Sequence, residues 1–435
     1  MAARLGGRNL VPAASVVRVK YSMEQLLMSD PDVIFLLCAG SNNKLSSRVR
    51  AILDKRPDWR NLKAVRNNRV YVLDAESYLY LPGKRYPEAF LGLAKFLYPE
   101  KDWEIRQRPE FRIVVLLLLA LFAVSALLCA MRCGSRELSY ARIIETLWNA
   151  DGGTDFLILY YIRLPRVVLG AMGGASLALS GAILQGVMRN PLASPGIIGV
   201  SAGGALTAVA IMLLLPQFAG LLVPSAFCGA LATAVLVYAL AWKGGIQPVR
   251  LILSGVAVAS MLSALVSVML LFNSERAVVI LDFMIGSLSA KSWTQIQLVW
   301  PYMAGGVIVS LLLAQVLNIL VLGDEVATGL GLRVELMRVI LLALSALLAA
   351  ASVSVVGLLG FVGLIAPHIV RLMIGSDYRY LLPGSVLFGA GMLVWCDTVG
   401  RMALDPVELP VGIILALLGP PFFLYLLRRS DGHEA

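Results

Sequence analysis

Apolar segments follow one another along the chain from residue 112 to residue 428. All but the eighth, which is short, are near the length of about 20 residues that a helix needs to cross the hydrocarbon core of a bilayer. Ten such segments are predicted, at 112–131, 164–187, 195–215, 218–242, 248–273, 297–322, 337–358, 359–374, 383–404 and 410–428. The pattern predicts a mainly α fold, a polytopic membrane bundle of ten transmembrane helices.

The first hundred residues have a different pattern, with short apolar runs between polar turns. The predicted elements are a helix capped by Ser22 and Gln25, a strand at 33–37, a turn at Asn67 and Asn68, a strand at 69–74 and a helix at 87–97. We therefore predict three parts: a small α/β partial lobe at 1–104, a linker at 105–111 and the membrane domain at 112–430.

Small residues recur four positions apart within the apolar segments. Gly170 and Gly174 form one such pair, and Gly199 and Gly203 form another. Small residues at this spacing let helix backbones approach closely in lipid. We expect these positions to pack helix against helix.

Composition separates the same two parts. The chain is 59% apolar and 15% charged, with a mean hydropathy of +0.80, whereas soluble domains are nearer 45–50% apolar and about 25% charged. Of the first 111 residues 31 are charged, against 33 of the remaining 324. These values exclude a single soluble domain and a nucleic-acid binder, and they place most of the chain in the lipid bilayer.

The distribution of basic residues predicts the orientation. An even number of spans puts both ends of the membrane domain on one side. With both termini cytoplasmic, the inner segments carry 12 Arg and Lys residues and the outer segments carry 8. Cytoplasmic loops are usually the richer in basic residues, so we expect both termini to be cytoplasmic.

The sequence offers little material for catalysis or metal binding. It has five scattered cysteines, two histidines and no Gly-x-x-x-x-Gly-Lys-Ser/Thr loop for nucleotide phosphates. His368 is interpreted as a structural residue, and we expect no catalytic residue, no metal site and no cofactor. A channel, a secondary transporter, a membrane enzyme and an ABC permease all remain possible at this level.

Three motifs narrow the choice. RLPR at 163–166 leads into RNPLASPG at 189–196, GFVGLIAPHIVR lies at 360–371, and ELPVG at 408–412 precedes LGPPFF at 418–423. Their order and spacing resemble the permease subunits of type II ABC importers for iron chelates, haem and cobalamin. Residues 20–104 resemble the C-terminal lobe of the family's substrate-binding protein, with the N-terminal lobe missing. Such a fragment should not clamp a substrate alone, and a cytoplasmic position conflicts with this origin.

The resemblance implies a bacterial or archaeal inner-membrane importer. Two permease chains would form a homodimer above two ATP-binding subunits, which hydrolyse the ATP, and a periplasmic or surface substrate-binding protein would deliver the cargo. The expected cargo is a ferric siderophore or related metal chelate, with cobalamin and haem as alternatives. An ion-driven secondary transporter would instead need intramembrane carboxylates, for which Asp397 and Glu408 are the candidates.

The resemblance also implies docking residues. Arg163, Arg166 and Arg401 match arginines that meet carboxylates of the binding protein, and Glu24 matches a docking glutamate of its C-terminal lobe. A planar guanidinium suits this task because it binds a carboxylate through two hydrogen bonds. The alternatives are arginines that snorkel to the interface, a pair between Arg401 and Asp397 within one helix, and an ordinary first-turn acid at Glu24.

Two further sites follow from the same resemblance. Asn190 and Leu192, in the loop after the second span, would line the cytoplasmic gate. The polar stretch between the sixth and seventh spans would be the coupling loop that sits on the ATPase, and its residues are Gly323, Asp324, Glu325, Gly329, Gly331 and Leu332. Asp324 and Glu325 are expected to begin a short helix, where acidic residues favour the helix dipole.

Overall fold

The computed structural model describes residues 23–38, 57–74, 109–134, 136–149, 152–243, 245, 248–273, 275, 277–404 and 407–431. The chain divides into two units, Met1–Ile105 with Arg429–Ala435, and Arg106–Arg428. Ser22, the predicted helix at 87–97 and most of the linker lie outside the described residues.

The described part of the first unit centres on two parallel strands. Its elements are α1 (Met23–Ser29), β1 (Ile34–Cys38), α3 (Pro57–Arg60), α4 (Lys63–Arg66) and β2 (Val70–Asp74). Ile34 pairs with Val70 and Cys38 with Asp74. Ala64 and Val70 are buried between α4 and the strands. Both predicted strands are confirmed to within one residue, and Asn68 turns the chain before β2 with a φ of 56°.

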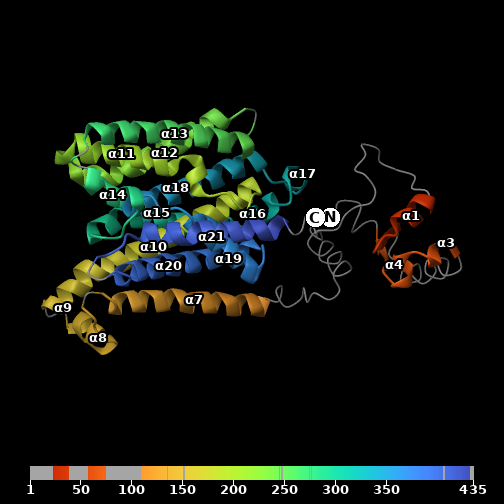
Figure 1. Ribbon diagram of the computed structural model, residues 1–435, viewed down its shortest axis with the longest axis horizontal. Helices are drawn as coiled ribbons and strands as arrows, with labels where there is room; N and C mark the ends of the chain where they lie inside the picture. Colours follow the sequence, from red (N-terminus) through yellow and green to blue (C-terminus); the bar gives the residue numbers. More distant parts are fainter. Residues whose placement is uncertain are drawn as a thin grey trace. The chain divides into compact units, whose positions relative to one another are not determined.

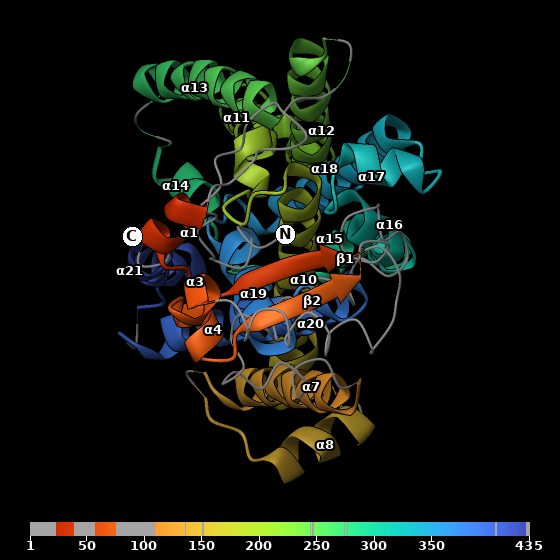
Figure 2. The same cartoon turned by 90° about the vertical axis from the view of Figure 1, so that its right-hand side faces the viewer.

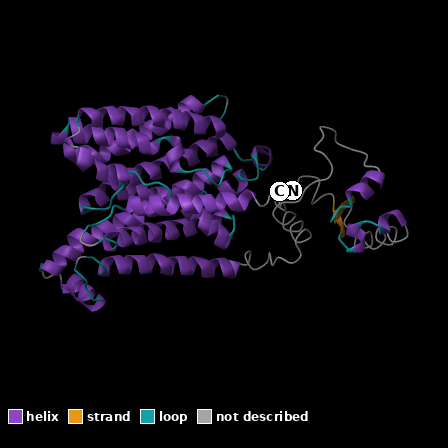
Figure 3. Ribbon diagram, in the orientation of Figure 1, coloured by secondary structure: helices purple, strands orange, loops and turns teal. Residues whose placement is uncertain are grey.

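The regular elements described in the second unit are all helices, joined by loops (Figure 3). Its elements are α7 (Pro109–Arg132), α8 (Tyr140–Asn149), α9 (Thr154–Leu157), η4 (Ile158–Arg163), α10 (Leu164–Met188), η5 (Pro195–Ile198), α11 (Val200–Leu214), η6 (Pro216–Leu221), α12 (Leu222–Ala241), α13 (Pro248–Phe272), α14 (Ala277–Ile285), α15 (Trp293–Leu312), α16 (Ala314–Leu320), α17 (Asp324–Gly329), α18 (Val334–Val356), α19 (Val362–Ile374), α20 (Tyr378–Met402) and α21 (Val411–Asp431).

Seven of these helical stretches are long and apolar enough to cross a membrane. They comprise α7, the continuous run α9–η4–α10, η6 with α12, α13, α15, α18 and α20. The helices α11, α19 and the apolar part of α21 are shorter. Each of the ten predicted apolar segments coincides with one of these helices, while ten membrane crossings remain a prediction.

The helix α10 forms the centre of this unit. It packs against α20, α18 and α19, and 83% of its spanning stretch is buried, against 22% for α13. Viewed from the end, α7 and α13 lie on opposite sides of the bundle with α10, α18 and α20 between them (Figure 2).

Glycines make the close approach of α10 possible. A Cβ on Gly174 would lie 2.2 Å from the carbonyl oxygen of Gly389 in α20, and one on Gly181 would lie 1.8 Å from that of Gly363 in α19. The expected packing role is confirmed for the second predicted pair too, because a Cβ on Gly203 would lie 2.4 Å from the carbonyl oxygen of Gly229.

Candidate functional site

Charged side chains gather at one end of the helix bundle, where α10 begins and α20 ends. Arg166 of α10 donates two hydrogen bonds to Asp397 of α20, from Nε at 2.8 Å and from Nη2 at 2.9 Å. Its Nη1 donates to Oε2 of Glu408 at 2.7 Å. The side chains of Arg166 and Asp397 are 9% and 5% exposed, whereas Glu408 is 47% exposed. This is a bidentate, largely desolvated ion pair.

Two more arginines attach the end of α7 to the same place. Arg401 Nη2 donates to the carbonyl oxygen of Ala130 at 2.9 Å. Arg163 Nη1 donates to the carbonyl oxygens of Met131 and Arg132 at 2.7 and 3.0 Å. The last carbonyls of a helix have no partner within the helix, so these cations satisfy them and complement the helix dipole. We call Arg163, Arg166, Asp397, Arg401 and Glu408 the arginine cluster.

The three predicted docking arginines are therefore brought together, but as buried groups. Arg163, Arg166 and Arg401 are 4%, 8% and 7% exposed, and each donates to acceptors in its own chain. The predicted pair within α20 is present, with Arg401 Nε 3.7 Å from Asp397 Oδ2, although Arg166 is the closer partner of Asp397. Docking by these residues stays a prediction.

A single lysine lies near this cluster, in the loop between α14 and α15. Burial lowers the pKa of Lys291 to about 8, against the opposing effect of Asp282, and the charge of Arg166 adds to the lowering.

The predicted docking residue Glu24 belongs to the first unit. It lies in the first turn of α1, and its side chain is outside the described part of the structure. Its docking role also stays a prediction.

The opposite end of the bundle carries a second charged site, around the start of α20. Asp377 caps α20 and binds Arg112 at the start of α7 at 3.1 Å, Arg379 at 2.7 Å and the amide of Asn318 at 2.9 Å. Burial opposes ionisation of Asp377, but the hydrogen bonds from Arg379 and Asn318 outweigh it and hold its pKa below the usual value. This site ties α7, α16 and α20 together.

The predicted gate residues lie at this same end, where α10 stops. Arg189 has left-handed backbone angles, with φ of 50° and ψ of 34°, and Pro195 begins the short helix η5. The predicted loop after the second span is confirmed, because it lies between the end of α10 and the start of η5. Asn190 Oδ1 accepts a hydrogen bond from the amide of Leu192 at 2.9 Å, which fixes the turn that holds both residues.

The predicted coupling loop also lies here, with α17 projecting at the end of the bundle (Figure 1). The predicted start of the short helix is confirmed, because α17 begins at Asp324. Gly323 and Gly331 bound it with φ values of 118° and 83°, which side chains rarely adopt. Leu332 closes the loop by donating its amide to the carbonyl of Ala327 at 3.0 Å. Ala327 is fully buried, while Asp324, Glu325 and Gly329 are exposed.

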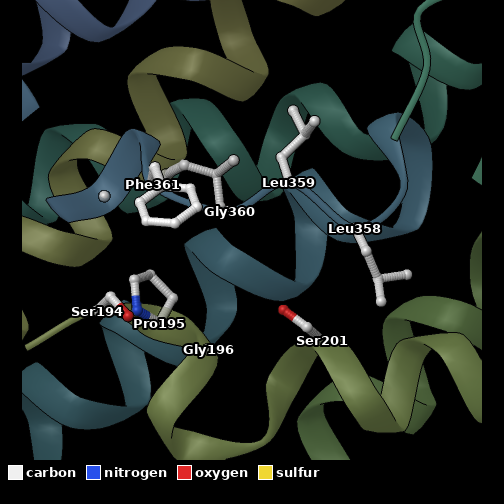
Figure 4. Close-up of a pocket in the computed structure, with 10 residues that line it drawn as sticks. Ser194, Pro195, Gly196, Ser201, Leu358, Leu359, Gly360 and Phe361 are labelled. Carbon is white, nitrogen blue, oxygen red and sulfur yellow. The ribbon is translucent and has the colours of Figure 1, made fainter. Parts of the chain in front are cut away.

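Between the two charged ends lies a groove that the sequence analysis missed. One pocket of about 210 Å³ lies between η5, the first turn of α11 and the loop before α19 (Figure 4). A second of about 290 Å³ continues from it along α11 and α13. The two share Gly196, Ser201 and Leu358.

We call these joined pockets the serine groove. Its hydroxyls come from Ser194, Ser201, Ser263 and Ser267, and each of the described residues that line it is uncharged. Hydroxyls on an apolar wall can hydrogen-bond a polar solute weakly without holding it by charge. The arrangement suits passage of a bulky polar solute better than tight binding.

Phe361 forms one wall of this groove (Figure 4). Its φ is 67°, in a region that is strained for a bulky residue. The ring packs on α21 where a Cβ on Gly419 would lie 2.2 Å from Cγ of Phe361. Strained residues of this kind cluster at functional sites, and this one holds the start of α19 beside the groove.

His368, which the sequence predicts to be structural, packs edge-on against Phe422 with ring centroids 6.1 Å apart. Among the described residues, no group of three or more His, Cys, Asp or Glu side chains could hold a metal ion.

Comparison with known proteins agrees with this architecture. Residues 117–429 match the FecCD transport family, and residues 1–77 match the family described as periplasmic binding protein. A solved structure, an inward-facing conformation of an ABC transporter assigned to the metal-chelate type, has 30% sequence identity and a TM-score of 0.64. The match covers 72% of this chain and 99% of that one.

The related permeases are named for different cargoes. The Fe(3+)-citrate import system permease protein YfmD of Bacillus subtilis is 39% identical over 75% of this chain and 97% of its own length. The hemin transport system permease protein HmuU of Yersinia pestis is 38% identical over 74% and 97%. The cobalamin import system permease protein BtuC of Halobacterium salinarum is 46% identical over 64% and 75%. The family match spans residues 117–429, which include nearly all of the helical bundle, and this chain therefore belongs to the FecCD transport family.

Proposed function

We propose that residues 112–430 form the permease subunit of an ATP-driven importer whose cargo is a ferric siderophore or related metal chelate. The observation that carries the proposal is the uncharged serine groove between two charged ends of the bundle. A ferric chelate is bulky and polar, and an uncharged path lets it pass without a deep electrostatic trap. Two iron-citrate permeases that are each 39% identical to about three quarters of this chain support this cargo.

The proposed assembly is a homodimer with two ATP-binding subunits and a substrate-binding protein. In it, all ten helices cross the inner membrane, and both termini are cytoplasmic. A homodimer is supported by α13, which lines the serine groove yet exposes Val249, Leu253 and Val256 on its surface. A second copy would cover this face and complete the wall of the path.

The ends of the bundle have separate proposed roles. The coupling loop, Gly323–Leu332, meets the ATPase, and Asn190 and Leu192 close the path beside it. At the other end the binding protein docks near the arginine cluster. Its carboxylates would compete with Asp397 and Glu408 for Arg166, so we propose that docking rearranges this cluster.

The N-terminal residues 1–104 are proposed to be a partial lobe of a substrate-binding protein. The match of residues 1–77 to the periplasmic binding protein family supports this origin. A binding protein holds its ligand between two lobes, so this block alone should not clamp cargo.

The rival function, an ion-driven secondary transporter, needs an intramembrane carboxylate that can exchange a proton or a cation. Asp397 is the buried candidate, and both of its oxygens accept hydrogen bonds from Arg166. A carboxylate neutralised in this way is poorly suited to ion coupling. The geometry therefore favours the ATP-driven importer.

Uptake by cells tests cargo and energy source together. The cells would express the full chain with its ATPase and an intact binding protein, and would receive labelled ferric siderophore, cobalamin or haem, with and without ATP depletion. We expect ATP-dependent accumulation of the ferric siderophore. Accumulation of cobalamin or haem instead would show that the proposed cargo is wrong. Uptake that survives ATP depletion would show that transport is not driven by ATP.

Filling the serine groove should block transport. Ser263→Phe places a ring in the groove. If the ring raises the free-energy barrier to passage by about 1.4 kcal/mol, uptake falls about tenfold. Met261→Phe also places a ring on α13, at an exposed position that lines neither pocket and lies off the face of Val249, Leu253 and Val256. Labelled uptake is measured at matched amounts of membrane-inserted protein. Equal uptake by both variants would show that the groove is not the path.

A further inference from the structure

The first residue of α17 binds arginines from two other elements. Asp324 accepts hydrogen bonds from Arg338 Nη2 on both oxygens, Oδ1 at 2.9 Å and Oδ2 at 3.0 Å. It also forms an ion pair with Arg189, which follows the last residue of α10. We call these three residues the Asp324 bridge.

One end of this bridge is fixed to the bundle. Arg338 lies near the start of α18 and is 6% exposed. Its Nη1 donates to Oε1 of Glu335 at 2.5 Å, and α18 is buried over most of its length. Asp324 is thus held against a helix that has little freedom to move.

The other end of the bridge is attached to the predicted gate. Arg189 immediately precedes Asn190, and its left-handed backbone sets the direction in which the chain leaves α10. The amide of Asn190 donates to the carbonyl of Gln185 at 3.1 Å, and its side chain fixes the turn to Leu192. A pull on the side chain of Arg189 therefore acts on the residue next to this turn.

We propose that the ion pair between Asp324 and Arg189 transmits movement of the coupling helix to the cytoplasmic gate, with Arg338 as the fixed side of the bridge. This inference rests on the proposed function of the two loops. Arg189 and Asp324 are positioning residues. When α17 shifts relative to α18, the hydrogen bonds from Arg338 to Asp324 are released, the carboxylate carries Arg189 with it, and the turn that bears Asn190 and Leu192 is displaced.

The exposure of the pair separates this role from a structural one. The side chains of Arg189 and Asp324 are 37% and 53% exposed, and exposed ion pairs contribute little to stability. Loss of the pair should leave folding and assembly intact while weakening coupling. The test therefore relies first on Arg189, because Asp324→Asn also weakens the hydrogen bonds from the buried Arg338, which keeps Glu335 as a partner.

The experiment uses the full chain with its ATPase and binding protein in proteoliposomes, with ferric siderophore as cargo. Arg189→Gln, Asp324→Asn and the double variant are compared with Arg189→Lys, which keeps the charge. Arg333→Gln removes another exposed arginine next to the same loop and is the matched control. Cargo moved per ATP hydrolysed and the ATPase rate are both measured.

We expect each single variant to lower the cargo moved per ATP by about fivefold, the lower end of the usual range for coupled sites. The ATPase rate should stay near that of the unmodified chain. The double variant should be no worse than either single one, and Arg189→Lys should keep most of the coupling. An unchanged ratio for Arg189→Gln, an equal fall for Arg333→Gln, or additive losses would each overturn the proposal.

A second measurement separates this proposal from the choice of cargo. Leu192→Cys is labelled with a water-soluble maleimide, with and without ATP, and the labelled peptide is quantified by mass spectrometry. We expect ATP to change the labelling rate, and Arg189→Gln to abolish that change. If the unmodified chain hydrolyses ATP but moves no ferric siderophore, the cargo is wrong, and the labelling still decides whether the bridge moves the gate. If ATP changes the labelling of Leu192→Cys equally with and without Arg189→Gln, the proposed role of the bridge is wrong.

Discussion

Replacing Asp397 with alanine is expected to destabilise the membrane domain more than any other single loss of a side-chain charge in the arginine cluster. The substitution leaves Arg166 and Arg401 buried, close together and without their shared carboxylate. Removing one partner of a buried ion pair typically costs about 3–5 kcal/mol. We expect the melting temperature of the purified protein in detergent to fall by roughly 10 °C.

Glu408→Ala is the matched control for this experiment. Glu408 also binds Arg166, but it is 47% exposed, so its loss should cost no more than about 1 kcal/mol. Asp397→Leu combined with Arg166→Met removes both buried charges and should recover part of the lost stability. A melting temperature of Asp397→Ala within about 2 °C of the unmodified protein would mean that the ion pair between Arg166 and Asp397 contributes little to stability.

Adding one methyl group to Gly181 is expected to prevent the normal packing of α10 against α19. The new Cβ would lie 1.8 Å from the carbonyl oxygen of Gly363 and 2.6 Å from its Cα. These are backbone atoms, so the two helices must separate, and the hydrogen bonds from Gln185 to the same segment are strained as well. We expect Gly181→Ala to cost about 3 kcal/mol, the upper end for overpacking.

The measurement is the yield of monodisperse protein in detergent, together with its melting temperature. Gly305→Ala adds the same methyl group inside α15, where nothing lies within 4 Å of the new Cβ. Alanine favours a helix over glycine by about 1 kcal/mol, so this control should be neutral or slightly stabilising. Similar behaviour of the two variants would show that α10 and α19 can adjust their spacing.

Local patterns predicted much of the fold because membrane helices depend mainly on local composition. The apolar segments coincide with the observed helices, and Asp324 begins α17 as expected from the preference of acidic residues for helix starts. The small-residue pairs also pack as expected. In each case the signal lies within one turn or one span of the chain.

The arginine cluster could not be predicted in the same way. Arg166 is separated from Asp397 by 231 positions and from Glu408 by 242, and nothing local indicates that they meet. The sequence suggested a pair between Asp397 and Arg401 because they lie four residues apart on one helix. That pair exists at 3.7 Å, but tertiary packing gives Asp397 a closer and bidentate partner.

The serine groove could not be predicted from the sequence for a similar reason. Its hydroxyls come from the loop before η5 and from α11 and α13, and each serine alone is typical of a membrane helix or a turn. Only the packing of these helices brings them to one surface.

The attachment of α7 at both ends has a mechanical consequence. Arg112 ties its first turn to Asp377 at the start of α20, and Arg401, near the end of α20, holds the carbonyl of Ala130 near the end of α7. At 1.5 Å per residue, the 24 residues of α7 extend about 36 Å. Two helices that are bonded to each other near both ends can tilt together, but they resist sliding past each other or separating. We therefore expect α7 and α20 to move as one rigid body, so that a displacement of the pair at one face of the membrane also displaces it at the other face.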